Sequence, residues 1–340
     1  MLIDSEVALD EALTRPSQAL IRFISTIPSP LVVLGAGGKM GPTLCVMAKR
    51  AAEAARHRLV VVAVSRFSDE ASRMWLEERG VRTIPCDVLD REAVGRLPDA
   101  GHVVYLVGMK FGTKQNPSLT WAINTLAPAI AVERYAGARV VALSTGNVYP
   151  FVDAGSAGAT EEIPLAPIGE YANACLGRER IYRYASERFQ TPLASVRLNY
   201  AVELRYGVLV DLAQRIARGE PVDLTMGYLN CIWQRDANDM ILRSFPLAGL
   251  PAAPVNLTGT ATLSVRHLAQ RLGALMDLPV AFAGSEAPTA LLNDARKTAA
   301  LLGEPETALE SMLSWTANWV KSGGTTHGKP THFQVRDGGF

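Results

Sequence analysis

The stretch that decides the fold is Leu31-Val-Val-Leu34, followed by Gly35-Ala-Gly-Gly-Lys-Met-Gly41 and by the segment 42–58. Four consecutive apolar residues predict a buried strand, and the longer segment predicts a helix. Glycines between the two allow a tight turn and let a pyrophosphate approach the backbone. The phosphates would then lie at the helix N-terminus, where free N–H groups favour anions. The stretch therefore predicts a dinucleotide-binding β–α unit. The alternative is a glycine turn without a ligand.

The alternation of short apolar runs and longer amphipathic segments continues toward the C-terminus. Strands are predicted at 59–64, 81–85, 102–107, 139–144 and 192–198, and helices at 69–80, 91–97, 119–135 and 171–189. Near-continuous apolar strands separated by helices are typical of a parallel sheet covered on both faces. The predicted fold class is therefore α/β, a Rossmann doubly wound parallel sheet with a smaller C-terminal substrate lobe.

The pattern divides the chain into four parts. They are an N-terminal helical extension (1–28), a Rossmann dinucleotide-binding core (29–198), a substrate lobe interleaved with the core (199–320) and a C-terminal tail (321–340). After Leu198 the helical segments are separated by loops that contain Pro and Gly, which is why the core is predicted to end there. The tail is rich in Gly, Thr and His. It is either disordered or an arm folded over the substrate pocket.

Composition excludes several classes of protein. The 340 residues carry a formal net charge of +1, with 48% hydrophobic and 20% charged residues, so no electrostatic footprint for nucleic acid or a membrane surface is expected. The N-terminus has no apolar signal-peptide segment, and the four cysteines form no CxxC pair, so we expect a cytoplasmic protein. The five histidines have no metal-binding spacing, so no metal site is expected.

Residues at the carboxyl ends of the first four strands should contact the dinucleotide, because parallel sheets bind ligands there. The expected contacts are Gly35, Gly37, Gly38, Lys39, Met40, Gly41, Arg66, Asp87, Val88, Val107 and Gly108. Asp87 is placed to accept a hydrogen bond from the adenine amine, although Asp is equally common as a turn or cap residue.

The end of the second strand bears on the choice of cofactor. NAD-binding proteins usually have an acidic residue there for the ribose hydroxyls. This chain has Ser65-Arg66-Phe67 instead, and Arg66 could hold a 2′-phosphate through charge-assisted hydrogen bonds. Lys39 adds a second positive charge in the glycine loop. The sequence therefore favours NADP over NAD, unless Arg66 is a solvated loop residue.

Taken together, these residues resemble the extended short-chain dehydrogenase/reductase superfamily, specifically the NAD-dependent epimerase/dehydratase group. Further matches are Asn124 in the helix after the fourth strand, the Ser144-Thr145 stretch after the fifth, Tyr171 as the tyrosine of a YxxxK motif, and Asp236 at the start of a late helix. The resemblance implies that Tyr171 is the acid/base, that Thr145 bonds the same substrate oxygen, and that Ser144 supports them. It also implies a homodimer formed through the helices at 119–135 and 171–189.

The sequence departs from this pattern at Cys175, which stands where the motif has lysine. The lysine would hold the nicotinamide ribose and lower the tyrosine pKa, and a thiol cannot supply that charge. Three interpretations stay open. Another cation (Lys110, Lys114 or Arg178) replaces the lysine, the chemistry needs no lowered tyrosine pKa, or the protein binds a dinucleotide without turnover. Cys175 itself is expected to be a small buried helix residue near the cofactor.

A second departure concerns the type of reaction. Sugar-nucleotide 4,6-dehydratases of the family carry an Asp-Glu pair after the catalytic Thr, whereas this chain has Gly146 and Asn147, so dehydration is disfavoured. Candidate substrate contacts are Lys110, Arg197, Trp233 and Arg235. Arg235 could instead form a surface ion pair and Trp233 could belong to the core.

The sequence-based hypothesis is an NAD(P)-dependent oxidoreductase or epimerase. It would transfer a hydride to or from a small-molecule substrate, a sugar or sugar-acid derivative. The alternative is a non-catalytic NAD(P)-binding regulator or redox sensor, motivated by Cys175.

Overall fold

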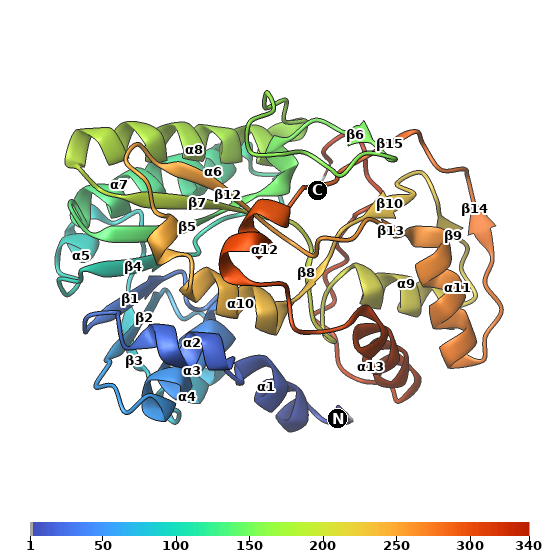
Figure 1. Ribbon diagram of the computed structural model, residues 1–340, viewed down its shortest axis with the longest axis horizontal. Coiled ribbons are helices and arrows are strands. Elements are labelled where there is room, and N and C mark those ends of the chain that lie inside the picture. Colours follow the sequence, from blue (N-terminus) through green and yellow to red (C-terminus); the bar gives the residue numbers. More distant parts are fainter. Residues whose placement is uncertain (1–2, 114, 340) are drawn as a thin grey trace.

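The computed structural model describes residues 3–113 and 115–339 (Figure 1). Within these residues a seven-stranded parallel sheet runs through the molecule in the order β12-β7-β5-β4-β1-β2-β3. Its strands are β1 (Leu31–Leu34), β2 (Val61–Ser65), β3 (Arg82–Pro85), β4 (His102–Tyr105), β5 (Arg139–Thr145), β7 (Leu193–Leu198) and β12 (Ala253–Leu257). The prediction of a doubly wound α/β fold is confirmed.

Helices cover both faces of the sheet. One face packs against α2 (Gln18–Ile24), α3 (Gly41–Ala54), α4 (Glu70–Glu77) and α10 (Gln234–Leu242). The other packs against α5 (Arg91–Gly95), α7 (Ala127–Arg134) and α8 (Gly169–Phe189), with α6 (Pro117–Trp121) and the π-helical segment η1 (Ala122–Leu126) leading into α7. Along β1, Leu31 and Val33 face the first layer and Val32 and Leu34 the second. A strand buried on both sides explains why its sequence is apolar throughout.

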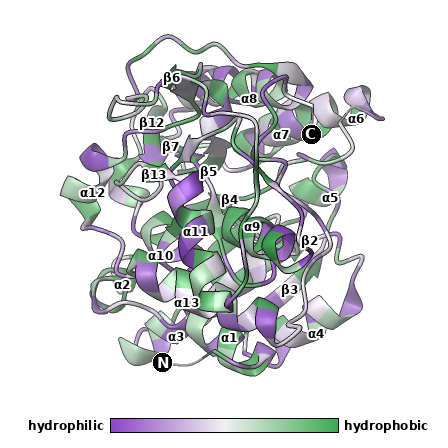
Figure 2. Cartoon of the chain, turned by 90° about the vertical axis from the view of Figure 1, so that its right-hand side faces the viewer, coloured by the Kyte–Doolittle hydropathy of each residue, from purple (hydrophilic) through white to green (hydrophobic). Residues whose placement is uncertain are grey.

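A second core forms the lobe at the right of Figure 1. It packs α9 (Val208–Ala217), α11 (Val265–Met276) and α13 (Leu309–Lys321) together with α1 (Glu6–Thr14). In Figure 2 these lobe helices stand in front of the sheet, with green and purple residues mixed along them. The remaining elements are η2 (Gly146–Val148), β6 (Val152–Asp153), β8 (Ala201–Val202), β9 (Val222–Asp223), β10 (Tyr228–Leu229), β11 (Ile232–Trp233), η3 (Phe245–Leu247), β13 (Leu263–Ser264), β14 (Phe282–Ala283), β15 (Thr289–Ala290) and α12 (Arg296–Leu302).

The sheet continues into the segment after residue 198, which the sequence assigned to a lobe interleaved with the core. β12 pairs with β7 in parallel, with Val255 opposite Val196, and α10 packs on α3. Both elements come from the segment assigned to the lobe. From their short apolar runs alone, the sequence does not show whether these two elements pack on the sheet or in the lobe.

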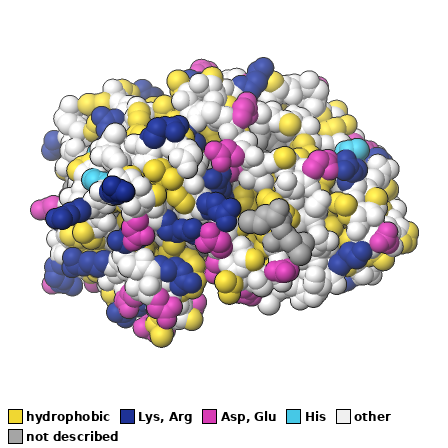
Figure 3. Space-filling model, turned by 60° about the horizontal axis from the view of Figure 1, so that its bottom comes forward, with side chains coloured by type: hydrophobic (Ala, Val, Ile, Leu, Met, Phe, Trp, Pro, Cys, Tyr) yellow, Lys and Arg dark blue, Asp and Glu magenta, His cyan; other side chains and the backbone are white. Residues whose placement is uncertain are grey.

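The N-terminal extension consists of two helices. Ser5 and Ser17 cap α1 and α2, respectively. The Ser17 amide donates to Asp239 of α10 at 2.9 Å, and α1 and α2 pack against α3. On this side of the molecule, which comes forward in Figure 3, side chains of both charge signs are interspersed. Among the described residues no helix has the length and apolarity needed to span a bilayer.

The C-terminal tail is an ordered arm that crosses the lobe. The Thr331 amide and hydroxyl both donate to the Asp211 carboxylate on α9, at 2.8 and 2.5 Å. Arg336 donates to the backbone oxygen and hydroxyl of Thr289 and lies over the ring of Phe151. Phe333 is buried in the lobe core. Of the two expectations for the tail, the folded arm is the one that the structure has.

Candidate dinucleotide and substrate site

The glycine loop between β1 and α3 forms a concave backbone surface, and side chains at two of the glycine positions would collide with neighbouring backbone. Gly35 has φ +84°, and a Cβ there would lie 2.7 Å from the amide nitrogen of Val107 at the end of β4. A Cβ on Gly41 would collide with the Ala36 carbonyl. No side chain caps the N-terminus of α3, so its free first-turn N–H groups can donate hydrogen bonds to an anion. The loop thus fits the pyrophosphate of a dinucleotide.

A cavity of about 370 Å³ lies on one side of this loop. It is lined by Gly37, Ser65, Arg66, Asp87, Val88, Val107 and Gly108, among others. Apart from Ser65, these are residues that the sequence assigned to cofactor binding, with Asp87 expected at the adenine and Arg66 at a 2′-phosphate. The Asp87 carboxylate accepts from the Leu89 amide at 3.0 Å, so it closes a turn as well as lining the cavity. Arg66 is exposed at this cavity, whereas Lys39 does not line it. The second charge expected beside a 2′-phosphate is therefore absent from the described lining.

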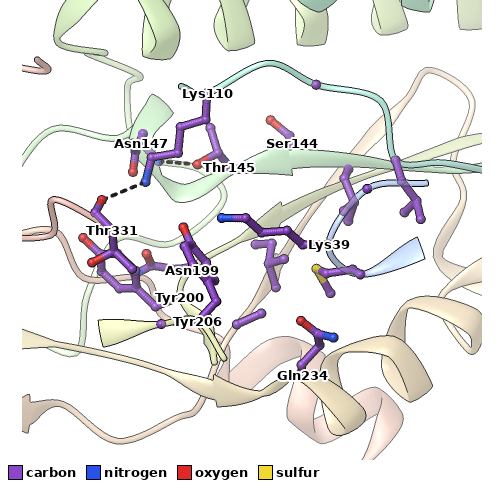
Figure 4. A pocket seen from close by; sticks show the side chains of 18 of the residues that line it. Lys39, Lys110, Ser144, Thr145, Asn147, Asn199, Tyr200, Tyr206, Gln234 and Thr331 are labelled. Atoms are coloured by element: carbon purple, nitrogen blue, oxygen red, sulfur yellow. Dashed lines mark hydrogen bonds between the residues drawn. The ribbon is translucent and has the colours of Figure 1, made fainter. Parts of the chain in front are cut away.

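A second cavity of about 380 Å³ lies on the other side of the loop, between the sheet and the lobe (Figure 4). Gly35, Gly38, Lys39, Met40 and Gly41 form one wall. The opposite walls are formed by residues after β4, β5 and β7 and by the lobe, namely Gly108, Lys110, Phe111, Ser144, Thr145, Asn147, Tyr171, Arg178, Asn199, Tyr200, Tyr206, Gln234 and Thr331. The two cavities meet at the glycine loop, so one dinucleotide could extend through both.

Two hydroxyl groups meet at the end of β5. Thr145 is the last residue of that strand, and Tyr171 lies in the first turn of α8. The Tyr171 side chain hydrogen-bonds with Thr145 and with Cys175. Burial, together with Cys175, raises the pKa of Tyr171 well above its ordinary value, and Arg178 offsets only part of this. Tyr171 is therefore protonated at neutral pH and can donate a proton to a substrate oxygen.

Ser144 lines the same cavity but its hydroxyl is directed to another partner. It donates to Glu179 of α8 at 2.5 Å. Glu179 in turn is ion-paired with Arg197 at 2.7 Å, and both side chains are buried. Ser144 therefore ties β5 to α8 and fixes the helix that carries Tyr171, which fits a supporting role.

The position of the missing lysine is filled by a thiol and an arginine. Cys175 is fully buried, and the Arg178 guanidinium donates to its sulfur at 3.0 Å and to the Val107 carbonyl at 3.1 Å. Arg178 also lines the second cavity, as Tyr171 does. Of the three cations considered from the sequence, Arg178 is thus bonded to Cys175, Lys110 lies across the cavity, and Lys114 falls outside the described residues.

Asn124 fixes the loop that carries Gly108. It lies in η1 and is fully buried. Its amide donates to the Met109 carbonyl at 2.9 Å and its oxygen accepts from the Met109 amide at 3.3 Å. Asn124 therefore positions the strand-end loop of β4 and does not itself line either cavity.

A family model described as the NAD dependent epimerase/dehydratase family matches residues 31–227. The chain belongs to this family. The resemblance to extended short-chain dehydrogenases/reductases is thereby confirmed, and it supports a nicotinamide-dependent enzyme. No curated protein matches the chain at a significant level.

Solved structures of the same fold agree with this membership. UDP-glucuronic acid 4-epimerase from Bacillus cereus, in complex with NAD, has TM-score 0.71 and 17% identity over 86% of this chain and 98% of that chain. The dTDP-glucose 4,6-dehydratase DesIV from Streptomyces venezuelae, with NAD and TYD bound, has TM-score 0.71 and 18% identity over 86% and 97%. UDP-glucose 4-epimerase from Thermotoga maritima, with UDP-glucose, has TM-score 0.68 and 17% identity over 86% and 99%. At these identities the likeness is one of fold.

Three expected substrate contacts lie outside the cavity. Arg197 is buried in its pair with Glu179 and also donates to the Tyr149 hydroxyl at 2.7 Å. Trp233 is buried and packs against Trp315, with ring centroids 5.3 Å apart. Arg235 is ion-paired with Asp236 at 2.8 Å and with Glu306 at 2.6 Å. Each has an internal partner that holds it away from a ligand, so of the four expected contacts only Lys110 faces the cavity.

Several cavity residues were missed from the sequence. Asn199 and Tyr200 directly follow β7, so the rule that applied to the earlier strand ends also pointed to them. Tyr206 lies just before α9, Gln234 is the first residue of α10, and Thr331 comes from the tail. No local pattern marks these three, because their positions depend on how distant segments fold back onto the sheet.

Proposed function

We propose that the protein is an NAD(P)-dependent oxidoreductase or epimerase that transfers a hydride to or from a carbon of a sugar or sugar-acid derivative. The observation that carries the proposal is the hydrogen-bonded pair Thr145–Tyr171, which lines the same cavity as the glycine loop. A bound nicotinamide would accept or supply the hydride. Tyr171 would then exchange a proton with the substrate oxygen, and Thr145 would hold that oxygen by a hydrogen bond.

Arg178 takes over the electrostatic part of the missing lysine. It cannot lose its proton, and its bonds to Cys175 and Val107 hold it beside Tyr171. Because its charge favours the phenolate, it makes proton loss from Tyr171 easier than it would be in its absence. The pKa of Tyr171 is still raised, so Tyr171 stays protonated, which is the state that proton donation in carbonyl reduction requires.

The alternative of a redox sensor receives less support. A sensor cysteine is accessible and has a lowered pKa. Cys175 is fully buried, and burial raises its pKa. Dehydration is also disfavoured, because Asn147 in the cavity wall and Gly146 beside it offer no acid or base.

For the cofactor, we propose NADP ahead of NAD, on the position of Arg66. It lies at the adenosine-side cavity with Ser65, Ser68 and Ser72, which could also bond a 2′-phosphate. Two of the three neighbours named above contain NAD, so the preference rests on this chain alone. Melting temperatures with the four cofactor forms test it, since a ligand at a hundred times its dissociation constant adds about 2.7 kcal/mol. Larger shifts with the NADP forms, lost in Arg66→Ala, are expected, and larger shifts with NAD would contradict the preference.

Tyr171→Phe tests the catalytic proposal. Hydride transfer to or from a panel of sugars and sugar acids, followed by nicotinamide absorbance, should fall by roughly 10²–10⁴-fold. Cofactor affinity should stay within about two-fold, since the ring remains. Tyr184→Phe, on the exposed face of the same helix, is the matched control and should change neither quantity. Unchanged turnover in Tyr171→Phe would exclude the mechanism.

A further inference from the structure

The substrate cavity has a strongly one-sided charge. Lys39, Lys110 and Arg178 line it, and among its described lining residues no side chain is acidic. Arg178 is bonded to Cys175 and Val107. In Figure 4 the other two cations enter from different walls, Lys39 from the glycine loop and Lys110 from the segment after β4, and their amino groups point toward the same space. Such a space favours an anion.

Lys39 carries a buried ammonium that the protein itself does not pair. Its Nζ is buried and has no hydrogen-bond partner among the described residues. It lies 3.0 Å from the ring centroid of Tyr206 and 4.5 Å from that of Phe111. Ring faces attract a cation, but they replace its hydration only in part. Burial, with repulsion from Lys110, accordingly lowers the pKa of Lys39 to about 7.

Lys110 is held at the opposite side of this space by the tail. Its Nζ donates to the Thr331 carbonyl at 3.4 Å, and burial lowers its pKa to about 8. The Asp211 carboxylate favours the charged form of Lys110, although Asp211 also accepts two hydrogen bonds from Thr331. An anion between the two lysines would favour the charged form of both.

The tail also limits the size of what can bind. Thr331 is itself part of the cavity wall, and Arg336 with Val335 and Gly338 closes a neighbouring space to about 30 Å³. The remaining cavity of about 380 Å³ must hold the nicotinamide end of the cofactor as well as the substrate. Because a drug-sized ligand alone needs roughly 300 Å³ or more, this cavity favours a small substrate.

We propose that the substrate is a small sugar derivative without a nucleotide, whose negative group lies between Lys39 and Lys110. This inference rests on the proposed function for the position of the reacting carbon. The negative group is a carboxylate or a phosphate, since either would satisfy the two lysines and the neutral donors Asn147 and Asn199 beside them.

Sulfate binding to the cofactor-saturated protein tests the anion site. Saturation keeps sulfate away from the pyrophosphate cradle, and sulfate does not titrate near neutral pH. Calorimetry should give one site whose affinity falls at least ten-fold in Lys39→Met and in Lys110→Met. Lys297→Met, at an exposed lysine paired with Glu162, is the matched control and should bind like the parent. Equal affinity in all four proteins, or no binding, would overturn the proposal.

Competition then separates the sources of the anion and tests size. D-Glucuronate or D-glucose 6-phosphate should displace sulfate at concentrations at least ten-fold lower than neutral D-glucose, the first indicating a carboxylate and the second a phosphate. Displacement by neither would overturn the anionic assignment. Tighter displacement by UDP-glucuronate than by glucuronate would overturn the nucleotide-free assignment. If no cofactor bound, the result would instead count against the proposed function. If the parent protein bound no sulfate but showed turnover that depends on Tyr171, the result would count against this inference alone.

Discussion

At the scale of single residues, the replacement of the motif lysine is a paired change. Cys175 is small and buried, and Arg178 reaches over it toward Tyr171. Cys175→Lys would place a second buried cation beside the guanidinium, where the carboxylate that acts on this position, Glu179, is already paired with Arg197. We expect it to destabilise the fold by about 3–5 kcal/mol, the range for an uncompensated buried charge, and not to raise activity.

The control for this prediction is Cys175→Ala, which removes the thiol without adding charge and should cost about 1 kcal/mol. Thermal melts and turnover of both variants provide the measurement. In the double variant Cys175→Lys/Arg178→Met only one cation remains, so it should recover much of the lost stability. A gain in activity from Cys175→Lys alone would instead identify a lapsed catalytic site.

Lys39 predicts a pH dependence of stability in the cofactor-free protein. Its folded pKa of about 7 lies below its ordinary value of 10.5. Between these values the unfolded chain binds more protons, so the free energy of unfolding rises with pH. The cost of burying Lys39 is full below pH 7 and disappears toward 10.5. The charged groups around it are Lys110 and Lys329, which lower its pKa, and Asp211 and Glu203, which raise it.

Lys39→Met should therefore raise the melting temperature at pH 7 and reduce its increase between pH 7 and 10. Lys297→Met serves again as control, because that lysine is exposed. Identical slopes for the two variants would mean that the Lys39 ammonium is hydrated in solution.

Residue-scale prediction from the sequence succeeded where a motif ties a residue to a strand end. The glycine loop, Thr145 and Tyr171 were expected to share one site, and they line one cavity. It was less specific where charge alone carried the argument. Arg197 and Arg235 were candidate ligand contacts, with an ion pair as the alternative for Arg235. In the structure Arg197 is paired with Glu179 and Arg235 with Glu306. Partner choice of this kind depends on tertiary structure.

At the scale of elements, η1 is the device that fixes the loop after β4. The π-helical segment places Asn124 so that one side chain satisfies both backbone groups of Met109. Asn124→Ala should leave those groups unpaired, cost about 1–3 kcal/mol, and weaken cofactor affinity about ten-fold because Gly108 is no longer held. Asn318→Ala, on the exposed side of α13, is the control. Unchanged affinity in Asn124→Ala would show that the loop is held by other contacts.

Element prediction was accurate for the βαβ series and silent on the tail. The predicted strand at 139–144 is β5, and the predicted helix at 171–189 is α8, each within two residues at either end. Apolar periodicity marks such elements because each buries a continuous face. The tail forms no regular element and is held by single polar anchors such as Thr331 and Arg336. Such anchors leave no periodic signal in the sequence.

At the scale of the whole molecule, the site exists because two cores meet. The sheet provides the glycine loop and the strand ends, whereas α9, the loop before it and the tail provide the opposite wall. The interleaving is visible at β12, which returns to the sheet from within the lobe segment. A movable linker between separate domains would not produce this topology. A site at the strand ends of a parallel sheet could be predicted from the sequence, whereas the strand order and the return of β12 from the lobe segment could not.

The last prediction concerns association of two chains, which the family resemblance implies. Large apolar side chains are exposed along the layer of α6, η1 and α8, including Leu126 at 46% and Tyr184 at 67% of their maximal exposure, with Trp121 nearby. We expect a homodimer through this layer, because a packed interface would bury these side chains.

Light scattering after size-exclusion chromatography should give twice the chain mass of 36.6 kDa. The double variant Leu126→Glu/Tyr184→Glu should run as a folded monomer, whereas Leu301→Glu, at another exposed leucine on α12, should stay dimeric. A parent protein that is monomeric at micromolar concentration would rule the dimer out, and a dimer that survives the double variant would move the interface to another face.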